Sequence, residues 1–193
     1  IMAFKPLWLY GLHAANAALK NPDRRIRRVL LNPSAGRGES LALDPKRHPK
    51  AETVDAFRLE KLLPPGAVHQ GVAVEADPLE EVSLEDWLAL GLEKPVLLLD
   101  QVTDPHNVGA ILRSAAAFDA GAVIITSRHA PEMTGALAKA ASGALELVPL
   151  IAVSNLAHAL EALKKASYWV AGLDGEARQT VAQANLGAKT ALV

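Results

Sequence analysis

The spacing of apolar and polar residues divides the chain into two parts. From Pro95 onward, short apolar runs alternate with alanine-rich segments whose apolar positions recur at helical spacing. The run VLLLD at 96–100 is unbroken, as expected for a strand covered on both faces of a parallel sheet. Strands alternating with helices in this way predict an α/β domain with a parallel sheet and helical crossovers.

The second part contains strand-like segments at residues 96–100, 121–126, 146–153, 168–174 and 188–193. Helices are predicted between them, at 107–118, 131–144 and 155–166. In an open parallel sheet, ligands bind at the carboxyl ends of the strands. Thr126, Gly172 and Asp174 lie at such ends and are candidates for ligand contact, although a simple turn explains Asp174 equally well.

The first part has shorter elements and more loop residues. We expect a helix at 12–19 that ends before Pro22, because proline disfavours helical geometry in the residue before it. The segments RRIRRVLLN and HQGVAVEA are predicted strands, and FRLEKLLPPG is a predicted short helix. Together these elements predict a small α/β module.

The distribution of charge supports the same division. Residues 1–71 carry 12 Lys and Arg against 6 Asp and Glu, whereas residues 72–93 carry 7 Asp and Glu and no basic residue. Residues 94–193 carry 8 of each sign. The predicted organisation is a basic module at 1–75, an acidic linker at 76–94 and a neutral domain at 95–193. Chance fluctuation by a few charges is the alternative.

Composition excludes several classes of protein. Of the 193 residues, 50% are hydrophobic and the formal net charge is −1, as is typical of a soluble globular protein. The absence of cysteine excludes disulfides and thiol catalysis, and the histidines lack the spacing of a metal site. No apolar run reaches the ~18–20 residues of a membrane span and no signal peptide is evident, so we expect a cytoplasmic protein without a membrane partner.

The loop after the first strand of the second part lacks the common phosphate-binding motifs. Neither G-x-G-x-x-G nor G-x-x-x-x-G-K-[ST] occurs there, which argues against a dinucleotide fold and a P-loop NTPase. The sequence is instead DQVTDPHNVGAILR. Pro105 restricts Asp104 to extended geometry, and Asn107 is the predicted N-cap of a helix that begins at Val108.

Arg113 lies inside this otherwise apolar helix. The residues one turn away on either side are Gly109, Ala110, Ala116 and Ala117. Because these side chains are small, the arginine has room to extend along the helix toward the strand ends. An unpaired buried charge would cost several kcal/mol. From the residues alone, two interpretations stay open: a functional cation, or an arginine that reaches solvent or pairs with Asp100 or Asp104.

A cluster of basic residues in the first module is the second candidate for function. Its members are Arg24, Arg25, Arg27 and Arg28. Such a cluster suits contacts with RNA phosphates, and a solvated charged face is the equally simple alternative. Arg37, in the loop segment GRGES, is a further candidate for RNA contact.

The segment DPHNVGAILRSAAAF resembles the first motif of the SpoU-type RNA ribose 2′-O-methyltransferases, a branch of the trefoil-knotted methyltransferase class. The segments GLHAANAAL, IRRVLLN and HQGV are similar to the small ribosomal-protein-like RNA-binding domain of the large-subunit rRNA guanosine 2′-O-methyltransferase group. KAASGALELVPLIAVSNLAHAL resembles the middle of the catalytic domain. One local departure is Asp119, where the family usually has glycine, and we expect it to matter little.

The resemblance implies transfer of a methyl group from S-adenosylmethionine to the 2′-hydroxyl of an RNA ribose. Arg113 and Asn107 correspond to the arginine and asparagine of the family's first motif. Because the pKa of an arginine exceeds ~12, we expect Arg113 to hold phosphate and stabilise the developing alkoxide, rather than to act as a base. A homodimer is implied, with the partner subunit completing each site. A tRNA ribose methyltransferase and a non-catalytic RNA-binding factor are the alternatives.

The resemblance also implies that this chain lacks most of the cofactor pocket. Family members continue beyond the strand equivalent to TALV with a Gly/Glu-rich motif, and later with a motif containing Ser, Leu and Asn, which together form the knot. We therefore expect an α/β-knot methyltransferase domain truncated before the knot, with the main cofactor residues beyond Val193. Thr126, Gly172 and Asp174 remain the candidates for cofactor contact within the chain.

Overall fold

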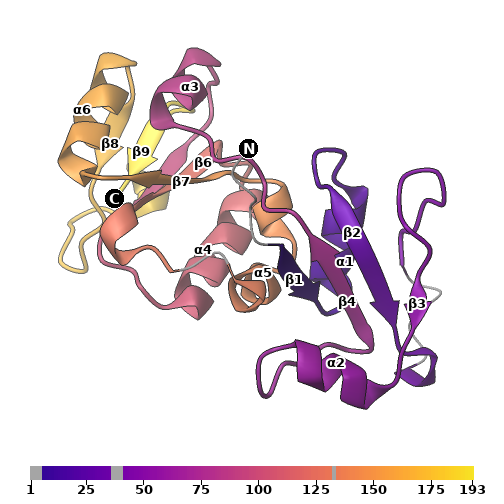
Figure 1. Cartoon of the computed structure of the whole chain (residues 1–193). Helices are drawn as coiled ribbons and strands as arrows, with labels where there is room; N and C mark the ends of the chain where they lie inside the picture. Colours follow the sequence, from indigo (N-terminus) through magenta and orange to yellow (C-terminus); the bar gives the residue numbers. More distant parts are fainter. Residues whose placement is uncertain (1–5, 36–40, 132–133) are drawn as a thin grey trace.

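The computed structural model describes residues 6–35, 41–131 and 134–193, which form two β-sheets with helices packed against them (Figure 1). The strands are β1 (Leu7–Tyr10), β2 (Ile26–Leu31), β3 (Glu52–Thr53), β4 (Val72–Ala76), β5 (Val96–Leu99), β6 (Ala122–Thr126), β7 (Leu150–Val153), β8 (Trp169–Ala171) and β9 (Thr190–Leu192). The first sheet has the strand order β1-β4-β2-β3, and the second has the order β7-β6-β5-β9-β8.

The α-helices are α1 (Leu12–Lys20), α2 (Ala56–Leu62), α3 (Leu84–Ala89), α4 (Pro105–Ala117), α5 (Gly135–Ala141) and α6 (Leu156–Lys165). The 3₁₀ turns are η1 (Pro33–Ala35), η3 (Ser127–His129), η4 (Ala144–Glu146) and η5 (Val181–Gln183). Within the described ranges, no helix combines the length and the apolar character that a membrane crossing requires.

The second sheet confirms the predicted parallel α/β architecture, since each of its strand pairs is parallel. Alternate residues of β5 face opposite layers: Leu99 packs into the core beneath α4 and α5, whereas Leu98 packs into the core beneath α3 and α6. Both faces of the central strands are therefore covered by helices, which explains why VLLLD is apolar throughout.

The first sheet is mixed. β4 lies between β1 and β2 and is antiparallel to both, whereas β2 and β3 are parallel. The sequence patterns did not predict β1 or β3. β3 has only two residues, and β1 follows Pro6 directly without an alternating pattern, so neither gives a periodic signal.

Several elements are shorter than predicted, such as β7, and the boundaries of α4 and α5 differ for identifiable reasons. The N-cap of α4 is Asp104, whose side chain accepts a hydrogen bond from the backbone N of His106 at 2.8 Å, so the predicted Asn107 cap is wrong. Proline is favoured in the first turn of a helix, and Pro105 occupies that position here. The predicted helix at 131–144 is shortened to α5, because Thr134 caps its start and Ser142 is left-handed with φ 49° at its end.

The acidic segment predicted as a linker contains α3, which packs onto the second sheet. Trp87 is 2% exposed, and its indole Nε1 donates a hydrogen bond to the carbonyl oxygen of Gly121 at 3.0 Å. Ser83 caps this helix by accepting a hydrogen bond from the backbone N of Asp86. Part of the acidic segment is therefore a structural layer of the second sheet.

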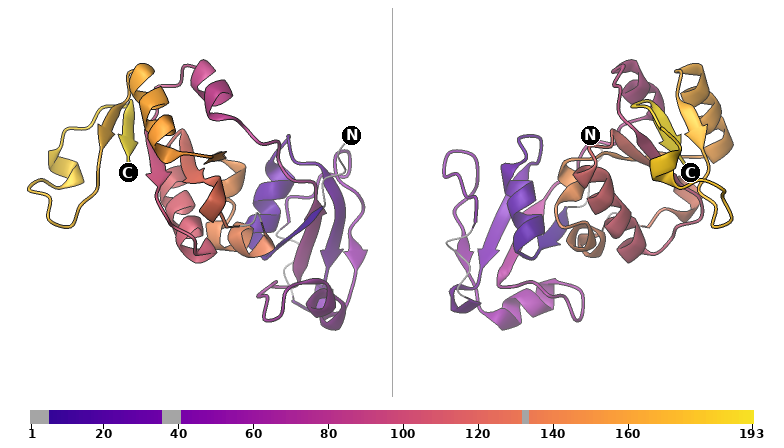
Figure 2. Two further views of the ribbon diagram at one scale, coloured as in Figure 1. Left: turned by 60° about the vertical axis from the view of Figure 1, so that its left-hand side comes forward. Right: turned by 180° about the vertical axis from the view of Figure 1, so that it is seen from behind.

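The two sheets are joined through helices rather than edge to edge. α1 and β1 of the first module lie against α5 and η4, on the side of the second module that also carries α4 (Figure 2). α3 and α6 lie on the opposite face of the second sheet.

Candidate active site and its relatives

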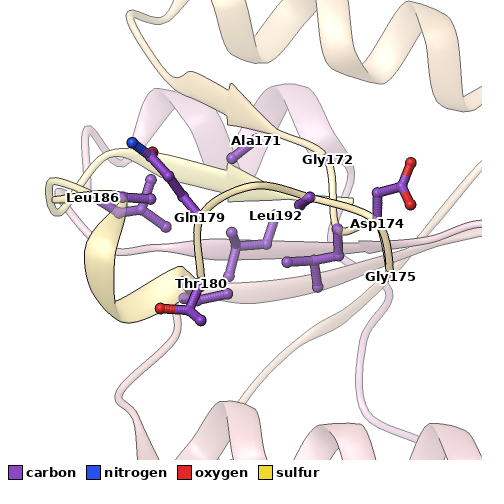
Figure 3. A pocket seen from close by; sticks show the side chains of 12 residues that line it. Ala171, Gly172, Asp174, Gly175, Gln179, Thr180, Leu186 and Leu192 are labelled. Carbon is purple, nitrogen blue, oxygen red and sulfur yellow. The ribbon is translucent and has the colours of Figure 1, made fainter.

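Two pockets lie at the carboxyl ends of the parallel strands. The first, the β8–β9 pocket, has a volume of about 500 Å³ and is lined by residues 171–175, by side chains between 177 and 186, and by Leu192 (Figure 3). The second, the β5–β7 pocket, has a volume of about 570 Å³ and is lined by residues at 100–101, 126–128 and 154–157. Both volumes lie in the ~300–1,000 Å³ range of small-molecule sites.

The β8–β9 pocket combines open backbone, apolar surface and one carboxylate. Gly172 and Gly175 have open space where a side chain would be, so a ligand can approach their backbone closely. Leu186 and Leu192 supply apolar surface, and Asp174 supplies a carboxylate on the loop after β8 (Figure 3). One oxygen of Asp174 accepts a hydrogen bond from the backbone N of Glu176 at 2.9 Å, which fixes this turn. The lining suits a ligand with a polar sugar and an apolar ring.

Most of the residues that line the β5–β7 pocket have polar side chains. The hydroxyl of Thr126 is buried there and has no hydrogen-bond partner among the described residues. Asn155 caps α6 at the same edge, where its side chain accepts hydrogen bonds from the backbone N atoms of Ala157 and His158 at 2.8 and 3.2 Å. The loop residue Gln101 is left-handed, with φ 54°.

The three predicted cofactor contacts do not form one site in this structure. Gly172 and Asp174 line the β8–β9 pocket, whereas Thr126 lines the β5–β7 pocket. β5 and β9 lie between β6 and β8, so three strand spacings, roughly 14 Å, separate Thr126 from the other two. The residue pattern correctly predicted that these residues lie at strand ends. It did not predict the strand order, which determines which strand ends are neighbours.

Arg113 is exposed on α4, and its Nη1 donates a hydrogen bond to the carbonyl oxygen of Ala140 in α5. Gly109 makes this contact possible, because a Cβ at that position would lie 2.5 Å from the Cβ of Ala140. The two helices therefore approach more closely than side chains would normally allow. Gly109 was predicted to leave space for the side chain of Arg113, and in the structure it allows α5 to pack close enough for Arg113 to bond to it.

Arg113 was predicted to extend toward the strand ends of its own sheet, but it lines neither of the two strand-end pockets. Helix α4 runs away from the carboxyl edge, and Arg113 comes eight residues after Pro105, roughly 12 Å along the axis. Ala140 lies in the last turn of α5, where carbonyl groups carry partial negative charge. Among the described residues, neither Asp100 nor Asp104 pairs with Arg113, so the guanidinium keeps its net charge.

Asn107 is exposed in the first turn of α4. It precedes Arg113 by six residues, which separates the two by roughly 9 Å along the helix and by roughly 120° around it. The side chains of Asn107 and Arg113 of one chain are therefore too far apart, and on too different faces of α4, to contact the same ligand atom.

The basic cluster of the first module is largely paired with carboxylates. Arg28 Nε donates to Glu52 at 2.9 Å, and Arg27 bonds to Asp77. The hydrogen bond from Arg28 lowers the pKa of Glu52, and the hydrogen bond to Asp77 raises the pKa of Arg27.

The remaining members of the predicted RNA-binding set differ in exposure. The side chain of Arg25 is 82% exposed and lies 3.8 Å from Asp77. Arg24 is 6% exposed, and its guanidinium bonds to Glu146, which argues against direct contact with a phosphate. Arg37 lies outside the described residues. No local pattern points to Glu146 as the partner of Arg24, because the two residues are 122 positions apart.

Two families match the chain. The profile of the SpoU rRNA Methylase family matches residues 94–193, and that of the RNA 2′-O ribose methyltransferase substrate-binding family matches residues 8–82. The 23S rRNA (guanosine-2′-O-)-methyltransferase RlmB of Pseudomonas putida is 39% identical over 194 residues, covering 92% of this chain and 74% of the relative. The protein of the same name from Escherichia coli K12 is 36% identical over 191 residues, covering 96% and 78%.

The fold has solved counterparts. The crystal structure of an AdoMet-bound rRNA methyltransferase from Sinorhizobium meliloti superposes with a TM-score of 0.71 at 17% identity, covering 97% of this chain and 69% of that one. The likeness therefore includes both modules and their order. With a profile match over more than half of its residues and relatives above one-third identity across nearly its full length, the chain belongs to the SpoU rRNA methylase family.

Proposed function

We propose that this protein methylates the 2′-hydroxyl of a guanosine ribose in large-subunit ribosomal RNA. The observation that carries this proposal is the joint match of a substrate-binding module and a methylase module to relatives named for that reaction. In this scheme residues 1–75 bind RNA, residues 76–94 connect the modules and residues 95–193 belong to the catalytic domain.

The β8–β9 pocket is the part of the chain that fits S-adenosylmethionine. Its volume of about 500 Å³ and its mixed lining suit an adenosine-containing ligand. When bound, the cofactor supplies an electrophilic methyl group. Gly172 and Gly175 would allow close approach of the backbone, Asp174 would accept hydrogen bonds from ribose hydroxyls, and Leu186 would cover an apolar ring.

Arg113 is the cation that we assign to the RNA. Among the described residues no carboxylate pairs with it, and its bond to Ala140 holds the guanidinium in place before RNA arrives. A pre-positioned cation stabilises a developing alkoxide or an adjacent phosphate without reorganisation. Since an arginine side chain stays protonated at neutral pH, proton removal from the hydroxyl falls to another group. We assign Asn107 to orientation of the same RNA segment.

The position of Arg113 favours a homodimer. Arg113 is exposed, and its position on α4 lies roughly 12 Å along the helix axis from Pro105, so it suits a site completed by a second subunit. Phe118, which follows the same helix, is 82% exposed and is therefore available to such an interface.

Subunit mixing tests the dimer. Arg113→Ala and Gly172→Trp would each inactivate a homodimer, the first at the RNA and the second at the cofactor pocket. Random mixing should restore roughly a quarter of wild-type activity, because each heterodimer then has one site with both residues intact. Heterodimers that form but remain inactive would place Arg113 and the pocket in the same subunit's site.

Transfer of tritiated methyl groups to purified RNAs tests the reaction itself. We expect incorporation into large-subunit rRNA and a single modified guanosine when the product is mapped. Incorporation into tRNA instead would establish the tRNA enzyme. An RNA complex without incorporation into either substrate would establish a non-catalytic RNA-binding factor.

A ribosomal RNA substrate also implies where the protein works. We propose that it acts in the cytoplasm, where ribosomal subunits are assembled. Co-sedimentation of the protein with ribosomal precursor particles in cell extracts is the expected result.

A further inference from the structure

The contact between the two modules has the character of a protein core. A single apolar cluster contains buried residues from both sides of it. From the first module come Leu9, Ala15, Ala18 and Leu19, and from the second come Leu137, Ala138, Ala141 and Leu145. Each of these residues is at most 7% exposed. Modules joined only by a flexible linker would leave both of these faces in solvent.

Glycines bring the backbones of the two modules into direct contact. A Cβ at Gly135 of α5 would collide with the carbonyl oxygen of Trp8 in β1. A Cβ at Gly143 would lie 2.5 Å from the Cβ of Ala17 in α1, and Gly143 is left-handed with φ 93°. The close approach is therefore built into the sequence on both sides of α5.

A buried ion pair crosses the same contact. Arg24 Nη2 and Glu146 Oε1 are 2.6 Å apart, and the two side chains are 3% and 4% exposed. Arg24 Nε donates to the other carboxylate oxygen at 3.2 Å, and Asn21 Nδ2 donates to it at 2.7 Å. Arg24 Nη1 donates to the carbonyl oxygen of Asp77 at 2.8 Å. Both charged groups are thus surrounded by directed hydrogen bonds.

The buried ion pair fixes the orientation of the two modules, whereas the apolar contact alone would only hold them together. Apolar faces tolerate small sliding and rotation, whereas a two-bond guanidinium–carboxylate contact is satisfied in one geometry. Leaving either charge buried without its partner is strongly unfavourable. The modules can therefore separate or rotate only by breaking the pair.

We propose that Arg24 and Glu146 are positioning residues that lock the RNA-binding module at one orientation to the catalytic sheet and thereby select the nucleotide that is methylated. The selection step rests on the proposed function. An RNA element held by the first module then reaches the strand-end pockets at one fixed distance, so nucleotides at other distances are not presented. Arg24 contributes to RNA recognition through Glu146 rather than through a phosphate.

The orientation is measurable without activity. The chain has no cysteine, so Lys46→Cys and Lys164→Cys, at exposed positions in different modules, accept spin labels selectively. Pulsed dipolar spectroscopy should give a narrow distance distribution for the otherwise unchanged protein. Glu146→Gln, which keeps shape but removes the charge, should broaden it at least twofold. Glu52→Gln, at the exposed partner of Arg28, is the matched control and should leave the distribution unchanged.

Activity tests the selection. With Glu146→Gln we expect the KM for an rRNA fragment to rise about tenfold or methylation to spread to neighbouring nucleotides, while cofactor affinity stays unchanged. Should this variant fail to fold, the double variant Arg24→Met/Glu146→Leu replaces the pair with apolar groups that preserve packing. A folded variant of either kind with a wild-type distance distribution and wild-type product map would overturn the proposal.

The outcomes separate this proposal from the proposed function. If the unchanged protein does not methylate rRNA, the proposed function and the selection step fail together, and the distance distributions still decide the locking of the modules. If the unchanged protein methylates one guanosine and the charge-removed variants retain that fidelity, the reaction stands and the positioning role of Arg24 and Glu146 fails.

Discussion

The arginines of β2 and the arginine of α4 differ in what surrounds their charge. Arg28 lies opposite Glu75 in the register of β2 and β4, and it bonds to Glu52 of β3. Arg113 lies among small residues on a helix and bonds only to a backbone carbonyl among the described groups. A dense run of arginines on a strand can thus be largely paired with carboxylates, whereas a lone arginine on a helix has no such partner among the described residues.

The cause of this difference is the neighbouring secondary structure. Cross-strand neighbours in a sheet lie ~4.5–5.5 Å apart, so a strand carrying arginines is stabilised by carboxylates on the adjacent strands. On α4 the neighbouring positions are filled by alanine and glycine, which permit close helix packing but supply no charge. Carboxylates on neighbouring strands therefore pair with most of the basic segment, whereas no described carboxylate pairs with Arg113.

The largest effect is expected from Arg24→Ala. Removing one partner of a buried ion pair leaves the other charge without compensation, which should lower the free energy of unfolding by about 3–5 kcal/mol. Arg28→Ala, which removes a half-exposed pair, should change it far less. Urea denaturation followed by circular dichroism measures both. Equal effects would show that burial does not distinguish the two arginines.

The next effect concerns catalysis. Arg113→Ala should lower the rate of methyl transfer by about 100-fold or more while leaving cofactor binding intact, because a pre-positioned cation is lost. The matched variant Arg28→Ala should retain most of the activity, since its charge is already paired. Single-turnover methyl transfer and equilibrium cofactor binding measure the two quantities. Wild-type turnover in Arg113→Ala would remove it from the site.

A smaller effect is expected from Gly109→Ala. The added methyl group would meet Ala140, so α4 and α5 must move apart at a cost of about 1–3 kcal/mol. The bond from Arg113 to Ala140 should weaken with this movement, and activity should fall by less than in Arg113→Ala. Thermal unfolding and the methyl-transfer rate test this together. Ala110→Gly, which removes a methyl group from the same helix, is the control for helix propensity.

The smallest effect is the acid response of Glu52. Arg28 lowers its pKa, so as the pH falls the unfolded chain takes up this proton before the folded chain does. The stabilisation is therefore present above the ordinary glutamate pKa of about 4.3 and is lost as the pH falls through the lowered value. Thermal unfolding between pH 7 and pH 3 should show a slightly weaker acid dependence in Glu52→Gln. An unchanged dependence would mean that solvent screens this pair completely.

The sequence predicted the parts of the fold that have local signals. The five strands of the parallel sheet, their order of appearance and the helices between them follow from apolar runs and helical spacing. The sequence offers two capping residues for α4, Asp104 and Asn107, and the preference of Pro105 for the first helical turn selects Asp104. The ion-pair partners of the arginines were not predictable, because they depend on contacts across 24 to 122 positions.

The departure from the family that was predicted at Asp119 has a local explanation. Asp119 is left-handed with φ 53°, the conformation that glycine adopts freely and that aspartate tolerates better than most residues. Its carboxylate also pairs with Lys94 at 2.6 Å on the surface. The expectation that this departure matters little therefore has a physical basis.

The order of strands in the second sheet determines when each strand can pair during synthesis of the chain. β8 pairs with β9, and β9 also completes the second side of β5, yet β9 is the last of these strands to be synthesised. About twenty residues separate β8 from β9, so at ~5–20 residues per second β8 waits roughly one to four seconds for its partner. During that interval the nascent chain exposes an unpaired edge of β5, which is the stage at which a chaperone or a misplaced strand would compete for it.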